Sequence, residues 1–128
     1  MKLLLDTHSF LWFIDGSPRL SATARQLIED PANQRLVSIA SLWEMAIKAS
    51  LGRLTFAQPF ATLMPEQLQR NSMQVLDIMV AHTAQVATLP FYHRDPFDRM
   101  LIAQALVDAI PIVGVDSAFD AYGITRLW

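Results

Sequence analysis

The sequence predicts an α/β fold with a mostly parallel central sheet covered by helices on both sides. Short apolar stretches alternate with helix-like stretches along the 128 residues. The apolar stretches carry few polar residues, which is typical of strands buried on both faces of a parallel sheet. Strands that alternate with helices favour right-handed crossovers. A hydrophobic content of 52% is enough for one core, so we expect a single domain over residues 1–128.

The expected elements follow from apolar runs and from residues that end them. Strands are expected at residues 2–5, 35–38, 74–78, 110–115 and 124–127. Helices are expected at residues 10–14, 22–29, 42–51, 60–70 and 80–89, with a further helix opened by Asp95 and Pro96 and a short one at residues 117–122. Gly, Pro and Asp clusters separate these stretches.

The helix opened by Asp95 has the clearest start signal in the chain. Asp95 is a good capping residue, Pro96 suits the first helical position, and Asp98 lies in the first turn near the positive end of the helix dipole. A second start signal is the capping-box pattern from Ser41 to Glu44, which opens the helix expected at residues 42–51. Lys48 follows Glu44 by four residues, a spacing that favours an ion pair within the helix.

Four acidic residues follow strands or begin helices. Asp6 and Asp116 come directly after expected strands, and Glu44 and Asp98 lie in first helical turns. Because a parallel sheet brings strand ends and helix starts to one edge, these carboxylates can converge there and hold Mg²⁺. Acids at helix starts are also favoured for capping alone. The spacing by itself leaves the two interpretations open.

Charge and composition restrict the classes of function. Ten Lys and Arg residues against 12 Asp and Glu residues give a net charge of −2, so the chain has no basic footprint for tight nonspecific nucleic-acid binding. Metal ions and a few arginines would have to attract any nucleic acid; Arg94 and Arg99 are candidates, with a solvated or salt-bridged role as the alternative. The absence of Cys excludes thiolate sites and suits the cytoplasm. The longest uncharged stretch, residues 78–93, contains Gln, Thr, His and Pro, so we expect no membrane span.

The chain resembles the PIN-domain family, and within it the VapC-like toxins of bacterial toxin–antitoxin pairs. The matching segments occur in order from one end of the chain to the other: LLLDTH at residues 3–8, SIASLWEMAIK at residues 38–48, HRDPFDRMLIAQA at residues 93–105 and DSAFDAYG at residues 116–123. Each segment alone is weak evidence, but all four in this order are specific.

The resemblance implies a PIN fold and a Mg²⁺- or Mn²⁺-dependent ribonuclease. It implies that Asp6, Glu44, Asp98 and Asp116 form the acidic quartet that binds the metal and carries catalysis. It also implies an RNA substrate, a cognate antitoxin that lies in a hydrophobic groove, and a homodimer. One departure is Gly114, because many relatives carry a hydroxyl residue at this position; the hydrogen bond that it would give a carboxylate is missing, and Ser117 or Thr7 are possible replacements.

Other residues fit more than one role. The side chains Trp12, Phe13, Trp43 and Met45 suit either a groove or the core. His8 and His93 are expected near the acidic edge as possible proton shuttles, outside the metal-binding set, and His82 is expected at a helix start. Two other functions remain open: a receiver-type Mg²⁺-binding signalling domain, although its strand-end Lys is missing, and a catalytically silent PIN-like binding module.

Overall fold

A five-stranded, wholly parallel sheet forms the centre of the protein. The computed structural model describes residues 1–128, and the strand order is β3-β2-β1-β4-β5. The strands are β1 (Lys2–Leu5), β2 (Gln34–Ser38), β3 (Gln74–Leu76), β4 (Ile112–Val113) and β5 (Arg126–Leu127). The predicted α/β fold class is therefore confirmed.

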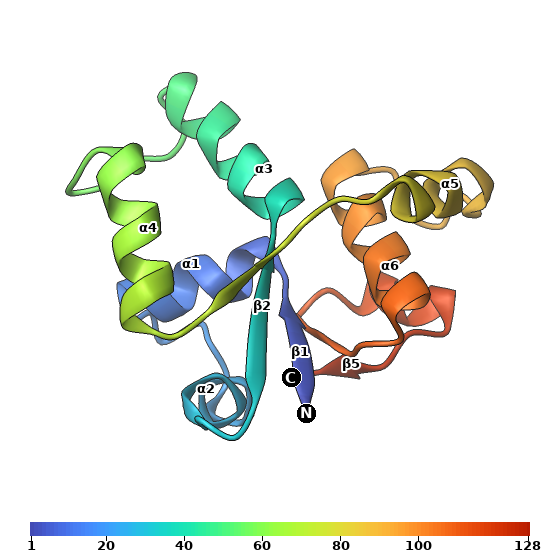
Figure 1. Ribbon diagram of the computed structural model, residues 1–128, viewed down its shortest axis with the longest axis horizontal. Helices are drawn as coiled ribbons and strands as arrows, with labels where there is room; N and C mark the ends of the chain where they lie inside the picture. The colour runs from blue at the N-terminus through green and yellow to red at the C-terminus, as the bar shows by residue number, and fades with distance from the viewer.

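Helices cover both faces of this sheet. They are α1 (Thr7–Asp15), α2 (Ala22–Glu29), α3 (Ile39–Ser50), α4 (Phe60–Arg70), α5 (Val80–Thr88) and α6 (Pro96–Asp108), with a short 3₁₀ helix η1 (Ser117–Tyr122). Figure 1 shows α1, α2 and α4 on one side of the strands and α5 and α6 on the other. The two expected helices at residues 22–29 and 60–70 have the predicted bounds.

The position of β1 in the sheet explains its run of three leucines. It pairs with β2 on one side and β4 on the other, so it is the middle strand of the sheet. Leu3 and Leu5 are fully buried in the core on one face, and Leu4 is fully buried in the core on the other. A strand between two helical layers needs apolar side chains in both directions.

Helix α3 begins earlier than predicted, and the capping-box interpretation of Ser41 and Glu44 is wrong. Strand β2 leads directly into the helix, and Ser38 is the N-cap, with its hydroxyl accepting a hydrogen bond from the Ala40 backbone N–H (3.0 Å). Ser38 also donates to Oε1 of the buried Gln104 on α6 (2.6 Å). This tertiary contact explains why Ser38 and not Ser41 caps the helix.

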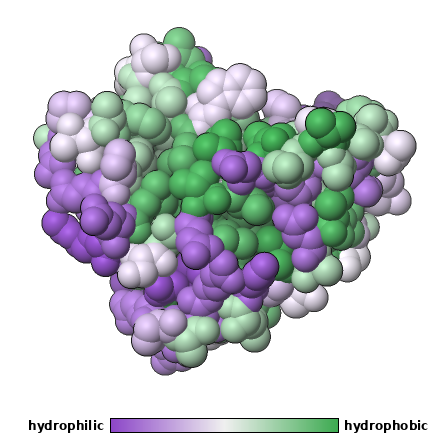
Figure 2. Space-filling model, in the orientation of Figure 1, coloured by the Kyte–Doolittle hydropathy of each residue, from purple (hydrophilic) through white to green (hydrophobic).

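Three strands are shorter than the sequence suggested, and helices α1 and α3 are longer. Strands β3, β4 and β5 contain three, two and two residues, whereas helix α1 starts at Thr7, directly after Asp6. None of the helices combines the length and apolar composition needed to cross a membrane. Figure 2 shows hydrophobic residues across the middle of one face of the molecule and hydrophilic residues at its lower left.

Candidate active site

Asp6 lies where β1 ends and α1 begins. Its carboxylate accepts a hydrogen bond from the Ser9 backbone N–H (2.8 Å), so it caps α1. The side chain is nevertheless almost fully buried. Burial raises the pKa of Asp6 above its usual value, the Ser9 hydrogen bonds oppose this shift, and the charge of Asp116 adds to it. Asp6 therefore has a capping role and also belongs to the acidic cluster.

Glu44 lies on α3 and is buried beside α1. Its Oε1 accepts a hydrogen bond from the Thr7 hydroxyl (2.8 Å), which is also hydrogen-bonded to Ser41 (2.9 Å). Its Oε2 accepts from Nζ of Lys48 (2.7 Å), and the predicted ion pair is confirmed. Thr7 thus orients a neighbouring carboxylate, the role that the sequence analysis suggested for it or for Ser117.

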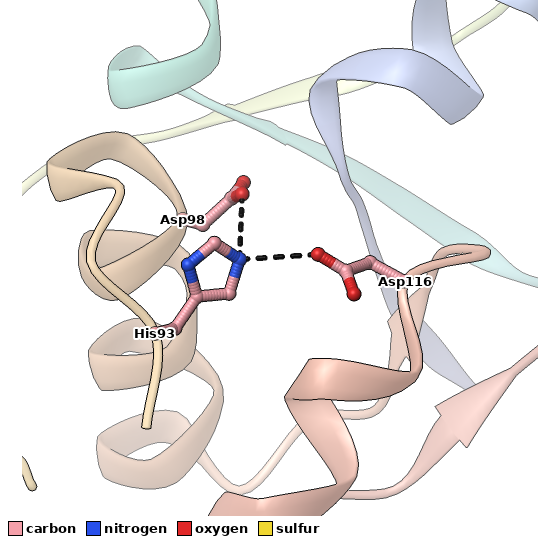
Figure 3. A group of neighbouring side chains, drawn as sticks. All are labelled: His93, Asp98 and Asp116. Atoms are coloured by element: carbon pink, nitrogen blue, oxygen red, sulfur yellow. Dashed lines mark hydrogen bonds and ion pairs between the residues drawn. The ribbon is translucent and has the colours of Figure 1, made fainter. Parts of the chain in front are cut away.

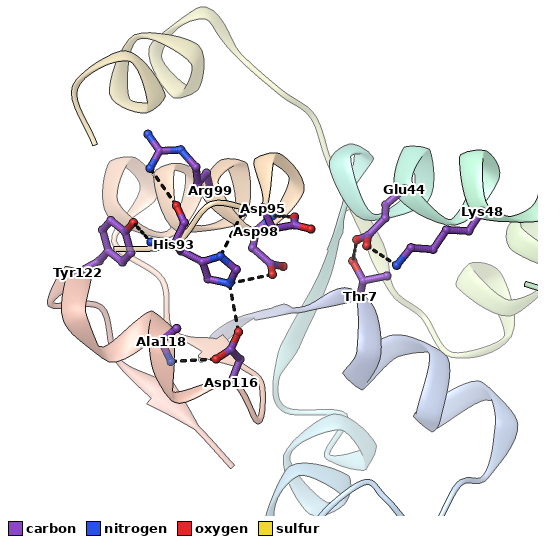
Figure 4. Close-up of polar contacts among 10 residues, drawn as sticks. All are labelled: Thr7, Glu44, Lys48, His93, Asp95, Asp98, Arg99, Asp116, Ala118 and Tyr122. Atoms are coloured by element: carbon purple, nitrogen blue, oxygen red, sulfur yellow. Dashed lines mark hydrogen bonds and ion pairs between the residues drawn. The ribbon is translucent and has the colours of Figure 1, made fainter. Parts of the chain in front are cut away.

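Asp95 and Asp98 share the start of α6 with different roles. The Asp95 carboxylate accepts from the Asp98 backbone N–H (2.9 Å), and Pro96 occupies the first turn, so the predicted cap is confirmed. The Asp98 carboxylate takes no part in the cap and points away from the helix end. Figure 4 shows Asp116, His93 and Asp98 as one connected group, with Glu44, Thr7 and Lys48 as a second group on the side of α3.

Asp116 follows β4 and caps η1. Its Oδ1 accepts from the Ala118 backbone N–H (2.9 Å), while Oδ2 faces the start of α6. Gly114, two residues earlier, lies against Asp6: a Cβ built at Gly114 would be 2.6 Å from Oδ2 of Asp6. Any larger residue here would have to displace the carboxylate, so the glycine makes room for Asp6 at the sheet edge.

His93 joins two of the predicted acids. Its Nε2 lies 3.1 Å from Oδ2 of Asp98 and 3.1 Å from Oδ2 of Asp116 (Figure 3). One side-chain atom from each of these three residues lies within 4.8 Å of the other two. The sequence placed His93 near the acidic edge but outside the metal-binding set; its position three residues before Pro96 gave no indication of which way the ring points.

The electrostatics connect all four predicted acids. The pKa of Asp98 is raised from 3.8 to about 7, first by burial and then by the charge of Asp95, while His93 opposes the shift and the charges of Glu44 and Asp6 add to it. Each of the four carboxylates thus affects, or is affected by, another of the set. Only Asp98 and Asp116 belong to the compact group with His93. Their mutual repulsion is the condition that a divalent cation relieves.

Arg99 does not have either of the roles suggested by the sequence. Its guanidinium is buried and donates to four backbone carbonyls, those of Val86, Leu89, Pro90 and His93. It also lies 4.1 Å from the centre of the Phe91 ring. It is neither free for phosphate nor solvated. Arg94 is exposed.

Of the four residues that suited either a groove or the core, three belong to the core or pack against it, and one lines a cavity. Met45 is fully buried in the core, and Trp12 and Phe13 are half-buried against it. Trp43 is 59% exposed and packs edge-on against Phe97 (5.3 Å between ring centroids). Both rings line an apolar cavity of about 280 Å³ with Ala40, Ile78, Val86, Pro96 and Met100. His82 lies in the first turn of α5, as predicted, and is buried against Asp108.

The donor set fits a hard divalent cation. Carboxylate oxygens are the ligands that Mg²⁺ and Mn²⁺ prefer, and the cluster offers them from Asp98 and Asp116, with Asp6 and Glu44 close enough to alter the pKa of Asp98. The protein thus combines a parallel α/β sheet with a cluster of acids, at the carboxyl edge of its strands, whose oxygen atoms fit a divalent cation.

Comparison with known proteins identifies the family. The PIN domain model matches residues 3–124. The chain therefore belongs to the PIN-domain family, as the sequence resemblance indicated. The structure is similar to that of VapBC2 from Rickettsia felis bound to a promoter DNA fragment, with a TM-score of 0.71, 13% identity and coverage of 98% of this chain and 97% of that one. It is also similar to DNA-bound VapBC from Salmonella typhimurium, with a TM-score of 0.70, 16% identity and coverage of 98% and 96%.

A curated relative gives a match at higher identity over a shorter length. Ribonuclease VapC16 of Mycobacterium tuberculosis (strain ATCC 25618 / H37Rv) is 39% identical over 71 residues, which cover 52% of this chain and 50% of the relative. The chain thus matches about half the length of this relative.

Proposed function

We propose that this protein is a metal-dependent endoribonuclease and the toxin component of a toxin–antitoxin pair. Asp6, Glu44, Asp98 and Asp116 are its catalytic and metal-binding residues. The proposal rests on one observation above the others: acids far apart in the sequence act at one edge of a PIN-domain sheet. The charge of Asp116 raises the pKa of Asp6, and the charges of Glu44 and Asp6 raise the pKa of Asp98. The similarity to Ribonuclease VapC16 supports the same activity.

The chain's own residues define what the site can do. Asp98 and Asp116 present oxygen atoms on one side, from α6 and from the β4–η1 junction. Glu44 is held by Thr7 and Lys48, and Asp6 by Ser9, so neither carboxylate is free to rotate away. A bound Mg²⁺ or Mn²⁺ supplies activation of a water and stabilisation of the leaving oxygen. The acids position that cation, and the expected product carries a 5′-phosphate.

The cation also has to attract the RNA. The net charge is −2, Lys48 is paired with Glu44, and Arg99 is buried against backbone carbonyls. Arg94 remains exposed beside the cluster and is available to a phosphate oxygen. RNA binding should therefore weaken strongly when the metal is removed.

The test is cleavage of RNA by the purified protein with Mg²⁺ or Mn²⁺. We expect cleavage by the wild type and none by Asp6→Asn or Asp98→Asn, because each removes a charge from the metal-binding set. Asp30→Asn is the matched control. Asp30 lies in the exposed turn after α2, and an Asn oxygen can still accept the hydrogen bond from Ala32. Cleavage that survives both site substitutions would refute the site.

The partners that we propose are a cognate antitoxin and a second copy of the chain, in the cytoplasm. Trp43 and Phe97, which line the apolar cavity, directly precede Glu44 and Asp98 in the sequence. An apolar segment bound in this cavity can therefore bring a basic side chain to the acids. The VapBC structures among the fold neighbours support this. Co-purification with the product of a neighbouring short gene tests the antitoxin, and sedimentation tests the homodimer.

A catalytically silent binding module is the alternative. In that case the acids only cap helices, a role that Asp6 and Asp116 do have. Titration with Mn²⁺ separates the two functions: a silent module gives no heat of binding and no change of melting temperature. A receiver-type domain no longer fits, because Lys48 lies on a helix and is paired with Glu44, and because the family is that of PIN domains.

A further inference from the structure

We infer that His93 is a positioning residue of the candidate metal centre. It holds the side chain of Asp116 by a hydrogen bond from Nε2, and the same nitrogen lies against the carboxylate of Asp98. Tyr122 and Arg99 hold the loop from which His93 projects. This inference rests on the proposed metal-dependent function and adds a residue that the acidic quartet does not contain.

The ring's hydrogen bonds define which nitrogen carries the proton. The Asp95 backbone N–H donates to Nδ1 of His93 (3.3 Å), so Nδ1 is an acceptor without a proton. In the neutral ring the proton is then on Nε2, the atom that lies 3.1 Å from both carboxylates. A histidine that binds a metal through Nε2 normally donates from Nδ1 to an oxygen. His93 has the opposite arrangement, which suits a hydrogen-bond donor to the ligands and not a ligand.

The backbone around His93 is held from two elements. The Tyr122 hydroxyl on η1 accepts from the His93 backbone N–H (2.8 Å) and donates to the Pro90 carbonyl (2.7 Å). Arg99 on α6 donates from Nη1 to the same Pro90 carbonyl (2.9 Å) and to the His93 carbonyl (3.3 Å). The ring itself stacks on the buried Phe119. The loop therefore has little freedom to move the imidazole away from the acids.

This arrangement matters because Asp98 and Asp116 belong to different elements and repel each other. Nε2 of His93 donates a hydrogen bond to Asp116 and keeps a polar contact with Asp98. One polar atom between the two carboxylates lowers the energy of the arrangement that a cation needs, before the cation arrives. Partners that hydrogen-bond metal ligands typically change metal affinity by about 10- to 100-fold when they are removed. We therefore expect His93 to affect metal affinity without contacting the metal.

The experiment uses substitutions that keep or move the donor. In His93→Gln the amide nitrogen can reach the position of Nε2, whereas in His93→Asn it corresponds to Nδ1, and His93→Ala has no donor. Mn²⁺ affinity is measured by calorimetry, with melting curves to verify folding. We expect Ala and Asn to weaken Mn²⁺ binding by about tenfold or more and Gln to restore most of the affinity. A merely structural role for the ring would not distinguish Gln from Asn.

A separate variant tests whether the loop that carries His93 helps to position it. Tyr122→Phe removes both hydrogen bonds of the hydroxyl and leaves His93 unchanged, and we expect a smaller loss of Mn²⁺ affinity. Tyr92→Phe is the matched control, because Tyr92 is exposed and packs on Tyr122 without a place among the acids. Equal Mn²⁺ affinities for wild type and Tyr122→Phe would show that the Tyr122 hydroxyl does not help to position His93.

Pulsed electron paramagnetic resonance of bound Mn²⁺ decides between donor and ligand. The protein has three histidines, so labelling with ¹⁵N-histidine identifies any nitrogen bound directly to the metal. We expect no directly bound nitrogen. A histidine nitrogen signal that is lost in His93→Gln would overturn the inference and make His93 a ligand. If the wild type binds Mn²⁺ and cleaves RNA but all His93 variants bind equally well, only this inference fails; if the wild type does neither, the proposed function fails with it.

Discussion

Burial and the charges of neighbouring acids together raise the pKa of Asp98. Its pKa in the folded protein is about 7, against 3.8 for an ordinary aspartate. Between these pH values the folded state holds a proton more tightly than the unfolded state. The stability of the metal-free protein should therefore fall as the pH rises from about 4 to about 7, and stay low above this range.

Replacing Asp98 with Asn should remove this loss. Without metal at pH 8, we expect Asp98→Asn to be more stable than the wild type by about 2 kcal/mol, less than the full linkage value, because 26% of the side chain is exposed to solvent. The difference should become small at pH 4. Urea unfolding in a chelator at both pH values measures it.

Asp120 provides the control for the pH experiment. It is exposed, and its hydrogen bonds with Arg126 lower its pKa. Its contribution is present above the usual pKa of an aspartate and is lost as the pH falls. Asp120→Asn should therefore not stabilise the protein at pH 8. Equal stabilities of wild type and Asp98→Asn at pH 8 would contradict the electrostatic explanation of the site.

Gly114 tests the close approach of the sheet to Asp6. The Cβ of Gly114→Ala would lie 2.6 Å from Oδ2 and 3.0 Å from Cγ of Asp6, which Ser9 holds in place. We expect a loss of about 1 to 3 kcal/mol in the free energy of unfolding and weaker Mn²⁺ binding. Urea unfolding and calorimetry measure the two effects.

A double-mutant cycle separates this contact from a general effect of alanine. Asp6→Ser keeps a capping oxygen on a shorter side chain, so Gly114→Ala should cost less in that background. Additive losses would mean that the Ala methyl group and the Asp6 carboxylate do not collide.

At the scale of elements, the loop between α5 and α6 depends on Arg99. Its guanidinium donates to three carbonyls of this loop and to that of Val86 in α5, and a lysine ammonium does not have the planar fork that reaches all of them. Arg99→Lys should lower the free energy of unfolding by about 2 to 3 kcal/mol. Arg94→Lys is the matched control, and as an exposed position it should cost less than about 0.5 kcal/mol. Urea unfolding compares them; similar losses for both arginines would contradict the bracing role of Arg99.

Element boundaries could be predicted only where the deciding contacts are local. Asp95 and Pro96 open α6 because the cap and the fixed φ act within one turn, and the sequence contains both. The predicted start of α3 is wrong because Ser38 and Ser41 are the same type of residue and therefore equally good caps. Contacts with distant residues, Gln104 for Ser38 and Thr7 for Ser41, assign their roles.

At the scale of the whole molecule, the candidate site joins the two helical layers. Asp6 and Glu44 belong to α1 and α3, while Asp98 and Asp116 lie on or beside α6 and η1. A cation bound between them should stabilise the folded state against unfolding. At 100 times its dissociation constant, this effect is about 2.7 kcal/mol, or a rise of about 10 °C in melting temperature for a chain of this size.

This stabilisation is measured by thermal unfolding with increasing Mn²⁺ at pH 8. Asp6→Asn should keep the cap and lose most of the metal-dependent rise, and Asp30→Asn should retain it. A rise of the same size in Asp6→Asn would mean that the cation binds elsewhere on the protein.

The sequence by itself determined the parallel α/β fold and the sheet edge at which Asp6, Glu44, Asp98 and Asp116 could meet, because apolar strands and helix starts are local signals that a parallel sheet arranges in one way. The family resemblance, and not the spacing, singled out these four acids as a site. Only the tertiary structure decided the directions of polar side chains: His93 toward two carboxylates, Arg99 toward the backbone, Asp6 into the space beside Gly114. These directions depend on loops and on partners far along the chain, so residue type and spacing do not predict them.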